Sequence, residues 1–262
     1  MRKDLGYTMP LQNVSLLVFD MDGVFRDSTK VVTEGFRRAF ESEGFDFGIE
    51  EREAHFLLGL GKYNDRNRCL LALLSLLRSK TDLKEIIYKI DAEAIIDQVV
   101  AKHSSDDDAS ILERLQNVYY SFINSDDAKR LMKIYPNSEA HMELLKKKGY
   151  KVAIFSNASI RSIKRDIPYL EKFDEVASIE TVKNKKPSGE GILLVAKSLG
   201  INLSNTAYVG DTIVDIQAAK DAGCKSIVLL EGGMGIIAHL EAEKPDLMFK
   251  NLADLAKHLT GR

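Results

Sequence analysis

Five short apolar-rich runs recur along the chain, and most are continuous rather than alternating. They occupy residues 16–19, 151–156, 173–178, 206–210 and 225–230. Continuous runs of this length are typical of strands buried on both faces of a parallel sheet. Helical periods follow or separate them at residues 138–148, 160–170, 189–199 and 214–222. This alternation of strand and helix predicts an α/β fold with a doubly wound parallel sheet.

The stretch from residue 30 to residue 133 has a different pattern. Leu-, Ile- and charge-rich helical periods run through residues 34–43, 50–58, 66–79, 83–103 and 109–123. No convincing strand pattern interrupts them, so this stretch is expected to be an all-helical insertion after the first strand. The predicted organisation is one core domain, residues 1–29 with 134–262, and one helical domain, residues 30–133.

Composition excludes several classes of function. A net charge of −2 over 262 residues gives no field to hold a polyanion, so neither nucleic acid nor a membrane surface is expected as partner. Two cysteines cannot form a disulfide framework, and no apolar stretch approaches the ~20 residues of a membrane span. Met1 to Asn13 contains no secretory signal pattern. These features predict a cytoplasmic protein, monomeric or homodimeric.

Acidic residues follow two of the predicted strands. Asp20-x-Asp22-Gly23 ends the first run, and Gly210-Asp211 with Asp215 ends the fourth. Carboxyl ends of parallel strands share one sheet edge, which is where open α/β sheets bind ligands. Four carboxylates that converge there repel one another unless a cation offsets them, and ligands made only of oxygen suit Mg²⁺. The sequence therefore predicts a Mg²⁺ site at this edge.

Polar residues near two further elements suit a phosphoryl group. Ser156-Asn157 follows the second run just before a helix, and Lys186-Pro187 precedes another helix. A hydroxyl, backbone N–H groups and a lysine at one crevice can neutralise phosphate oxygens beside a positioned nucleophile. This combination points to phosphoryl transfer.

These motifs together resemble the haloacid dehalogenase (HAD) superfamily. The segment from Phe19 to Ser28 resembles its first motif, Ser156 the second, Lys186-Pro187 the third and residues 210–215 the fourth. Residues 245–255 are similar to the closing strand and helix of the family. The helical insertion resembles the C1-type cap of phosphoglycolate-phosphatase-like members, although it is longer by about one helix pair near residues 80–103. The resemblance implies a Rossmann-like core with a cap domain.

The resemblance also implies roles for individual residues. Asp20 would be the nucleophile that forms an aspartyl-phosphate, and Asp22 the general acid and then base. The metal ligands would be Asp20, Asp211, Asp215 and the carbonyl oxygen of Asp22. Ser156, Asn157 and Lys186 would bind the phosphoryl group, and Lys62, in a cap loop after two glycines, would contact the leaving-group portion of a small phosphorylated substrate.

The implied activity is a Mg²⁺-dependent phosphatase that hydrolyses a small phosphate monoester, either phosphoglycolate-like or a sugar phosphate. Three alternatives stay open. A β-phosphoglucomutase-like mutase would carry a His about ten residues after Asp22, where this chain has Val32. A phosphonate or haloacid hydrolase would lack an acid two residues after the nucleophile, where this chain has Asp22. A non-catalytic binding protein on the same fold is the third alternative, since fold does not fix function.

Overall fold

The chain divides into two compact units in the computed structural model, which describes residues 11, 13–232 and 236–261. Of the described residues, the first unit comprises 11, 13–26, 134–232 and 240–261. The second comprises 27–133 and 236–239. The N-terminal segment for which no secretory signal is predicted lies, apart from Leu11 and Asn13, outside the described residues.

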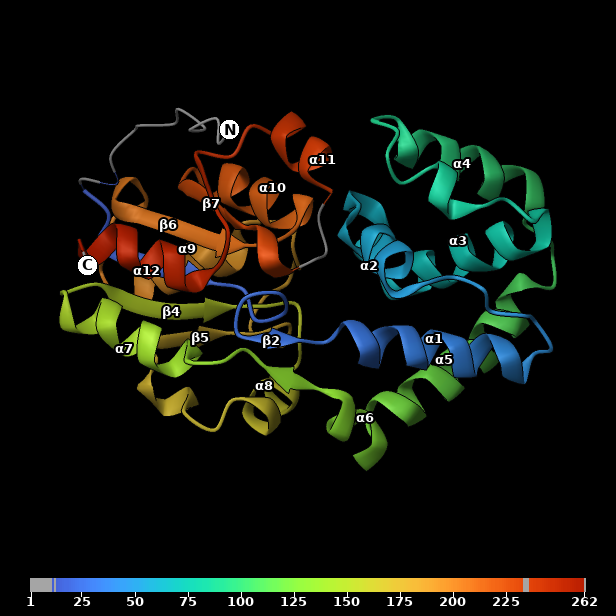
Figure 1. Ribbon diagram of the computed structural model, residues 1–262, viewed down its shortest axis with the longest axis horizontal. Helices are drawn as coiled ribbons and strands as arrows, with labels where there is room; N and C mark the ends of the chain where they lie inside the picture. Colours follow the sequence, from blue (N-terminus) through green and yellow to red (C-terminus); the bar gives the residue numbers. More distant parts are fainter. Residues whose placement is uncertain (1–10, 12, 233–235, 262) are drawn as a thin grey trace. The chain divides into compact units, whose positions relative to one another are not determined.

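A six-stranded parallel sheet forms the centre of the first unit (Figure 1). Its strand order is β5-β4-β1-β6-β7-β8. The strands are β1 (Leu16–Phe19), β4 (Lys151–Phe155), β5 (Glu175–Ala177), β6 (Thr206–Gly210), β7 (Lys225–Leu229) and β8 (Leu247–Phe249). The chain moves outward from β1 through β4 and β5, and then returns to the other side of β1 at β6. The predicted doubly wound sheet is confirmed, with its switch point beside β1.

Helices cover both faces of this sheet. On one face Leu17 and Phe19 of β1 lie in a core with residues of α7, α8 and α12. On the other face Leu16 and Val18 lie in a core with residues of α9 and α10. This two-sided burial is the reason for the continuous apolar runs. The helices of this unit are α7 (Ser138–Lys147), α8 (Ile160–Asp166), α9 (Glu190–Ser198), α10 (Ile213–Ala222) and α12 (Leu252–Thr260), while α11 (Ile237–Ala242) crosses the division between the units.

The second unit is helical, and its core contains stacked aromatic rings. Its helices are α1 (Thr29–Ser42), α2 (Glu51–Gly59), α3 (Arg66–Ser79), α4 (Ala92–His103), α5 (Asp108–Ile123) and α6 (Asp126–Leu131). The rings of Phe36 on α1 and Tyr119 on α5 stack with centroids 5.1 Å apart. Gly35 permits this close approach, since a Cβ there would lie 2.9 Å from the Tyr119 ring. None of the described helices is both long and apolar enough to cross a membrane.

The helical period predicted over residues 83–103 forms only in part. Only a 3₁₀ turn (Leu83–Glu85) and α4 form there, separated by turns. Tertiary contacts explain the break, because Ile86 and Ile87 are buried and the Ile87 carbonyl oxygen lies 2.9 Å from Nε2 of His239. That carbonyl oxygen is therefore engaged by a side chain distant in sequence, where a continuous helix would bond it internally.

Two short strands connect the units and were not predicted. β2 (Arg26–Asp27) pairs with β3 (Lys133–Ile134) in a two-stranded sheet. Next to this pair, the Phe25 carbonyl oxygen accepts a hydrogen bond of 2.9 Å from the Tyr135 N–H. Strands of two residues carry no periodicity, so the sequence pattern could not indicate them.

Candidate active site

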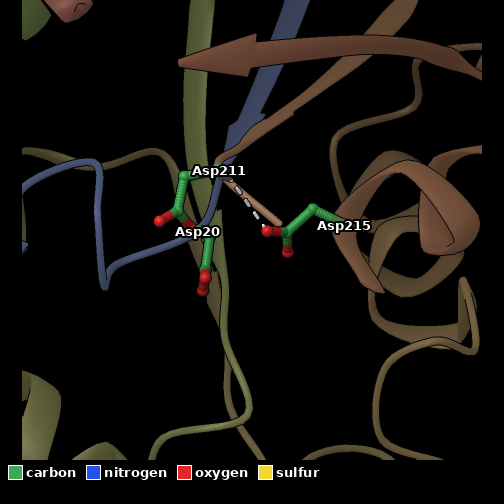
Figure 2. A group of neighbouring side chains, drawn as sticks. All are labelled: Asp20, Asp211 and Asp215. Atoms are coloured by element: carbon green, nitrogen blue, oxygen red, sulfur yellow. Dashed lines mark hydrogen bonds between the residues drawn. The ribbon is translucent and has the colours of Figure 1, made fainter. Parts of the chain in front are cut away.

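Three carboxylates converge at the carboxyl end of the central strands (Figure 2). Asp20 follows β1 directly, and its N–H donates a 2.8 Å hydrogen bond to the Val209 carbonyl oxygen of β6. Asp211 follows β6, and Asp215 lies in the first turn of α10. One oxygen from each carboxylate lies within 4.8 Å of the others, and all three residues are buried. The structure thus brings together the carboxylates of Asp20, Asp211 and Asp215, which were all predicted to be metal ligands.

Asp211 is the carboxylate that most needs a cation. It is 1% exposed, and neither of its carboxylate oxygens has a hydrogen-bond partner among the described residues. Burial, with the charges of Asp215 and Asp20, raises the pKa of Asp211 well above its ordinary value. A buried carboxylate without partners is costly, and a divalent cation that binds oxygen would satisfy it.

Two glycines leave room around Asp211. Gly23 has φ +74°, and a Cβ there would lie 2.1 Å from Asp211 Oδ2. A Cβ on Gly232 would lie 2.5 Å from the same oxygen. Side chains at either position would occupy the space beside the unpartnered oxygen. The donor set and the space around it therefore fit a cation such as Mg²⁺.

Asp215 is held differently from Asp211. Its Oδ2 accepts hydrogen bonds from the Asp211 N–H at 3.1 Å, the Thr212 N–H at 3.0 Å and the Thr212 hydroxyl at 2.6 Å. Burial raises the pKa of Asp215, but Lys186 and the Thr212 hydrogen bonds outweigh burial and leave this pKa below its ordinary value. Asp215 is therefore a fixed anion that shapes the loop carrying Asp211.

Lys186 supplies the buried cation of the site. Its Nζ lies 2.7 Å from Asp215 Oδ1, 2.9 Å from Asp20 Oδ1 and 3.0 Å from the Tyr208 hydroxyl. Asn157 holds its backbone, because Asn157 Oδ1 accepts from the Lys186 N–H at 2.9 Å and Asn157 Nδ2 donates to the Lys186 carbonyl oxygen at 3.3 Å. The Asn157 side chain, expected to bind phosphate, thus contacts the backbone of Lys186 in this structure.

Asp20 lies between a cation and other anions. The pKa of Asp20 is raised to about 6, mainly by burial. The charge of Lys186 lowers this pKa, and the charges of Asp215 and Asp22 raise it. A carboxylate in contact with Lys186 and shielded from water can act as an oxygen nucleophile.

Ser156 lies at the same sheet edge, and Asp22 is held apart from the carboxylate cluster. Ser156 follows β4, is 2% exposed and accepts a 3.2 Å hydrogen bond from the Ala158 N–H at its Oγ. Both carboxylate oxygens of Asp22 accept hydrogen bonds from Arg26, at 2.9 and 2.8 Å. The Asp22 side chain is therefore not part of the three-carboxylate group.

Lys62 lies in the helical unit, where its Nζ forms an ion pair with Asp97. Its side chain is 36% exposed. The Tyr63 hydroxyl donates to the same Asp97 carboxylate at 2.5 Å. A contact between Lys62 and substrate stays a prediction.

Three residues of the site were missed in the sequence. Tyr208 contacts Lys186 and donates a 2.7 Å hydrogen bond to the Phe155 carbonyl oxygen, but it looks like an ordinary strand residue. Thr212 caps α10, and its spacing from Asp215 is a signal that capping rules could have found. Arg26 stands out only as a charge beside an apolar stretch.

Comparisons with known proteins show which family this chain resembles. The family model of haloacid dehalogenase-like hydrolases matches residues 14–223. A phosphoglycolate phosphatase of Salmonella typhi is 26% identical over 94% of this chain and 92% of its own length. The pyrophosphatase PpaX of Bacillus cereus is 32% identical over 56% of this chain and 69% of its own length.

A solved structure shares the fold. It is a Lactobacillus delbrueckii protein provisionally assigned as a phosphoglycolate phosphatase, with a TM-score of 0.76, 18% identity, and coverage of 95% of this chain and 100% of its own. The relatives thus include the expected phosphoglycolate-phosphatase-like subgroup. Because the family model covers most of the chain, this protein belongs to the haloacid dehalogenase-like hydrolases.

Proposed function

We propose that this hydrolase is a Mg²⁺-dependent phosphatase that acts on a small phosphate monoester, either a phosphoglycolate-like compound or a sugar phosphate. The observation that carries the proposal is the position of Asp20, buried, in contact with Lys186 and beside the unpartnered carboxylate of Asp211. The phosphoglycolate phosphatases and the pyrophosphatase among the relatives support a phosphate-containing substrate.

In the proposed reaction an oxygen of Asp20 attacks phosphorus. A bond forms between that oxygen and phosphorus, the ester P–O bond breaks, and Asp22 gives a proton to the leaving alkoxide. Water then attacks the aspartyl-phosphate and loses a proton to Asp22, which restores the Asp20 carboxylate and releases inorganic phosphate. Lys186 and Ser156 hold the phosphoryl oxygens during both steps.

The metal ligands in this proposal are the carboxylates of Asp20, Asp211 and Asp215 and the main chain of Asp22. Bound Mg²⁺ would neutralise negative charge on the transferring phosphoryl group. Residues 1–29 with 134–262 would form the catalytic core, and residues 30–133 the cap domain, in which Lys62 would bind the leaving-group portion. A cytoplasmic location and a monomer or homodimer stay predictions from the sequence.

A panel of phosphorylated metabolites tests the proposal. Phosphate release is measured for each compound with Mg²⁺ and with EDTA. The Asp20→Asn variant is compared with Asp254→Asn, which changes an exposed carboxylate on α12. We expect release that requires Mg²⁺, is lost in Asp20→Asn and is retained in Asp254→Asn. No release from any compound, or release that EDTA leaves unchanged, would contradict the proposal.

A further inference from the structure

Arg26 is a buried arginine that bridges two carboxylates of the first unit. It is 4% exposed. Its Nε and one terminal nitrogen donate to the two oxygens of Asp22 at 2.9 and 2.8 Å, and its other terminal nitrogen donates to Asp166 Oδ2 at 2.5 Å. The planar guanidinium thus forms a bidentate contact with the Asp22 carboxylate, and a lysine cannot reproduce this geometry.

The guanidinium is held independently of Asp22. Its contact Asp166 is the last residue of α8, and Arg165 donates to the two oxygens of Asp166 at 2.6 and 2.9 Å. The Ser162 hydroxyl accepts from Arg26 at 3.2 Å. An arginine fixed from α8 can set the position of a more exposed partner.

The backbone brings Arg26 and Asp22 together through a tight loop. The Gly23 N–H donates to the Arg26 carbonyl oxygen at 2.8 Å, and the Arg26 N–H donates to the Met21 carbonyl oxygen at 3.2 Å. The Asp22 side chain is 24% exposed, whereas that of Arg26 is 4% exposed. The carboxylate therefore has an open side, and the Arg26 contact restrains its rotation.

We infer that Arg26 is a positioning residue for this hydrolase, which fixes the orientation of the Asp22 carboxylate for proton transfer to the leaving group. The inference rests on the proposed function, in which Asp22 exchanges that proton. A misplaced proton donor weakens catalysis most for leaving groups that need the proton. The Asp166 contact anchors Arg26, and Arg26 in turn orients Asp22.

The first test compares turnover of an alkyl phosphate with that of an aryl phosphate. For Arg26→Met we expect kcat to fall about tenfold or more for the alkyl phosphate and less than about threefold for the aryl phosphate. Arg26→Lys keeps the positive charge but loses the bidentate geometry, so its kcat should also fall more for the alkyl phosphate than for the aryl phosphate. Asp22→Asn provides the reference for complete loss of the proton donor.

Arg161→Met is the matched control, because Arg161 is an exposed arginine on the same helix, α8. It should keep the alkyl-to-aryl ratio of the parent protein. Equal losses on both substrates in Arg26→Lys, or no loss, would overturn the inference, since a purely structural role would not discriminate between leaving groups. A split of the same size in Arg161→Met would overturn it as well.

A second readout needs no activity. Melting temperatures are measured in EDTA for Asp22→Asn, Arg26→Lys and the double variant. If the two side chains are coupled as the structure shows, the double variant loses less than the sum of the single losses. If the losses of melting temperature are additive and the enzyme is active, the positioning role of Arg26 is refuted and the proposed function stands. If the losses are coupled but the protein releases no phosphate, the proposed function is refuted.

Discussion

Replacement of Asp211 by Asn should make the metal-free protein more stable and remove its stabilisation by Mg²⁺. In the metal-free protein Asp211 is buried, has no hydrogen-bond partner among the described residues and lies beside two other carboxylates. Asn has nearly the same shape, carries no charge and offers N–H donors to the neighbouring oxygens. It therefore relieves repulsion but removes a charged ligand.

The size of the effect follows from the geometry. The ligand oxygens lie within 4.8 Å of one another. Two unit charges at that separation repel by about 3.5 kcal/mol at an effective dielectric constant of about 20. Two effects reduce the net repulsion, because Lys186 offsets part of it and the raised pKa of Asp211 lowers the average charge of this carboxylate. A net gain of about 1 kcal/mol corresponds to a rise of about 2–4 °C in Tm for a chain of this size.

Thermal unfolding in EDTA and at several Mg²⁺ concentrations measures both the stability without metal and the stabilisation by Mg²⁺. For the parent protein, a Mg²⁺ concentration of about 100 times Kd should add about 2.7 kcal/mol to the free energy of unfolding. Asp211→Asn should lose most of this response, and Asp254→Asn should keep it. A variant that responds to Mg²⁺ as the parent does, or a parent whose Tm Mg²⁺ leaves unchanged, would refute the reasoning.

Three further predictions concern pH, the helical unit and packing. Burial raises the folded-state pKa of Asp20 from 3.8 to about 6, so this group's contribution to stability without metal is present below about pH 4 and is lost as pH rises through 6. Protons compete with Mg²⁺ for the same carboxylate, so the Mg²⁺-induced rise in Tm should be larger at about pH 7.5 than at about pH 5; an equal rise would contradict this. Lys62→Ala should raise KM for anionic substrates and leave KM for an aryl phosphate nearly unchanged. If steady-state kinetics are unaltered on every substrate, Lys62 does not contact the substrate. Gly191→Ala should lower the free energy of unfolding by about 1–3 kcal/mol in denaturant titrations, because its Cβ would lie 2.2 Å from the Phe155 ring, whereas Gly48→Ala, with no heavy atom within 4 Å, should show no such loss.

The strands and the carboxylate cluster could be predicted because both depend on local sequence. Apolar runs in the sequence predict β1 and β6 at their observed bounds, residues 16–19 and 206–210, and these strands are buried throughout. Residues that follow parallel strands must lie at one edge, so the proximity of Asp20 and Asp211 follows from the sheet itself. The family model over residues 14–223 confirms the resemblance that these motifs carry.

Features that depend on distant contacts could not be predicted. The helix expected at residues 83–103 begins only at Ala92, because buried isoleucines and His239 stabilise turns before it. The contact between the side chain of Asn157 and the backbone of Lys186 joins residues 29 positions apart. Arg26 contacts Asp166 across 140 positions, and no periodicity or spacing reports such a pair.

The identity of the residue that carries the phosphoryl group tests the central claim most directly. The parent protein is quenched in acid during turnover of its best substrate with Mg²⁺, digested, and mapped by mass spectrometry for a phosphoryl adduct. We expect the adduct on the peptide that contains Asp20, and its absence from Asp20→Asn, which should fold but not turn over. Turnover at a near-parent rate by Asp20→Asn, or an adduct on another residue, would contradict the aspartyl-phosphate mechanism.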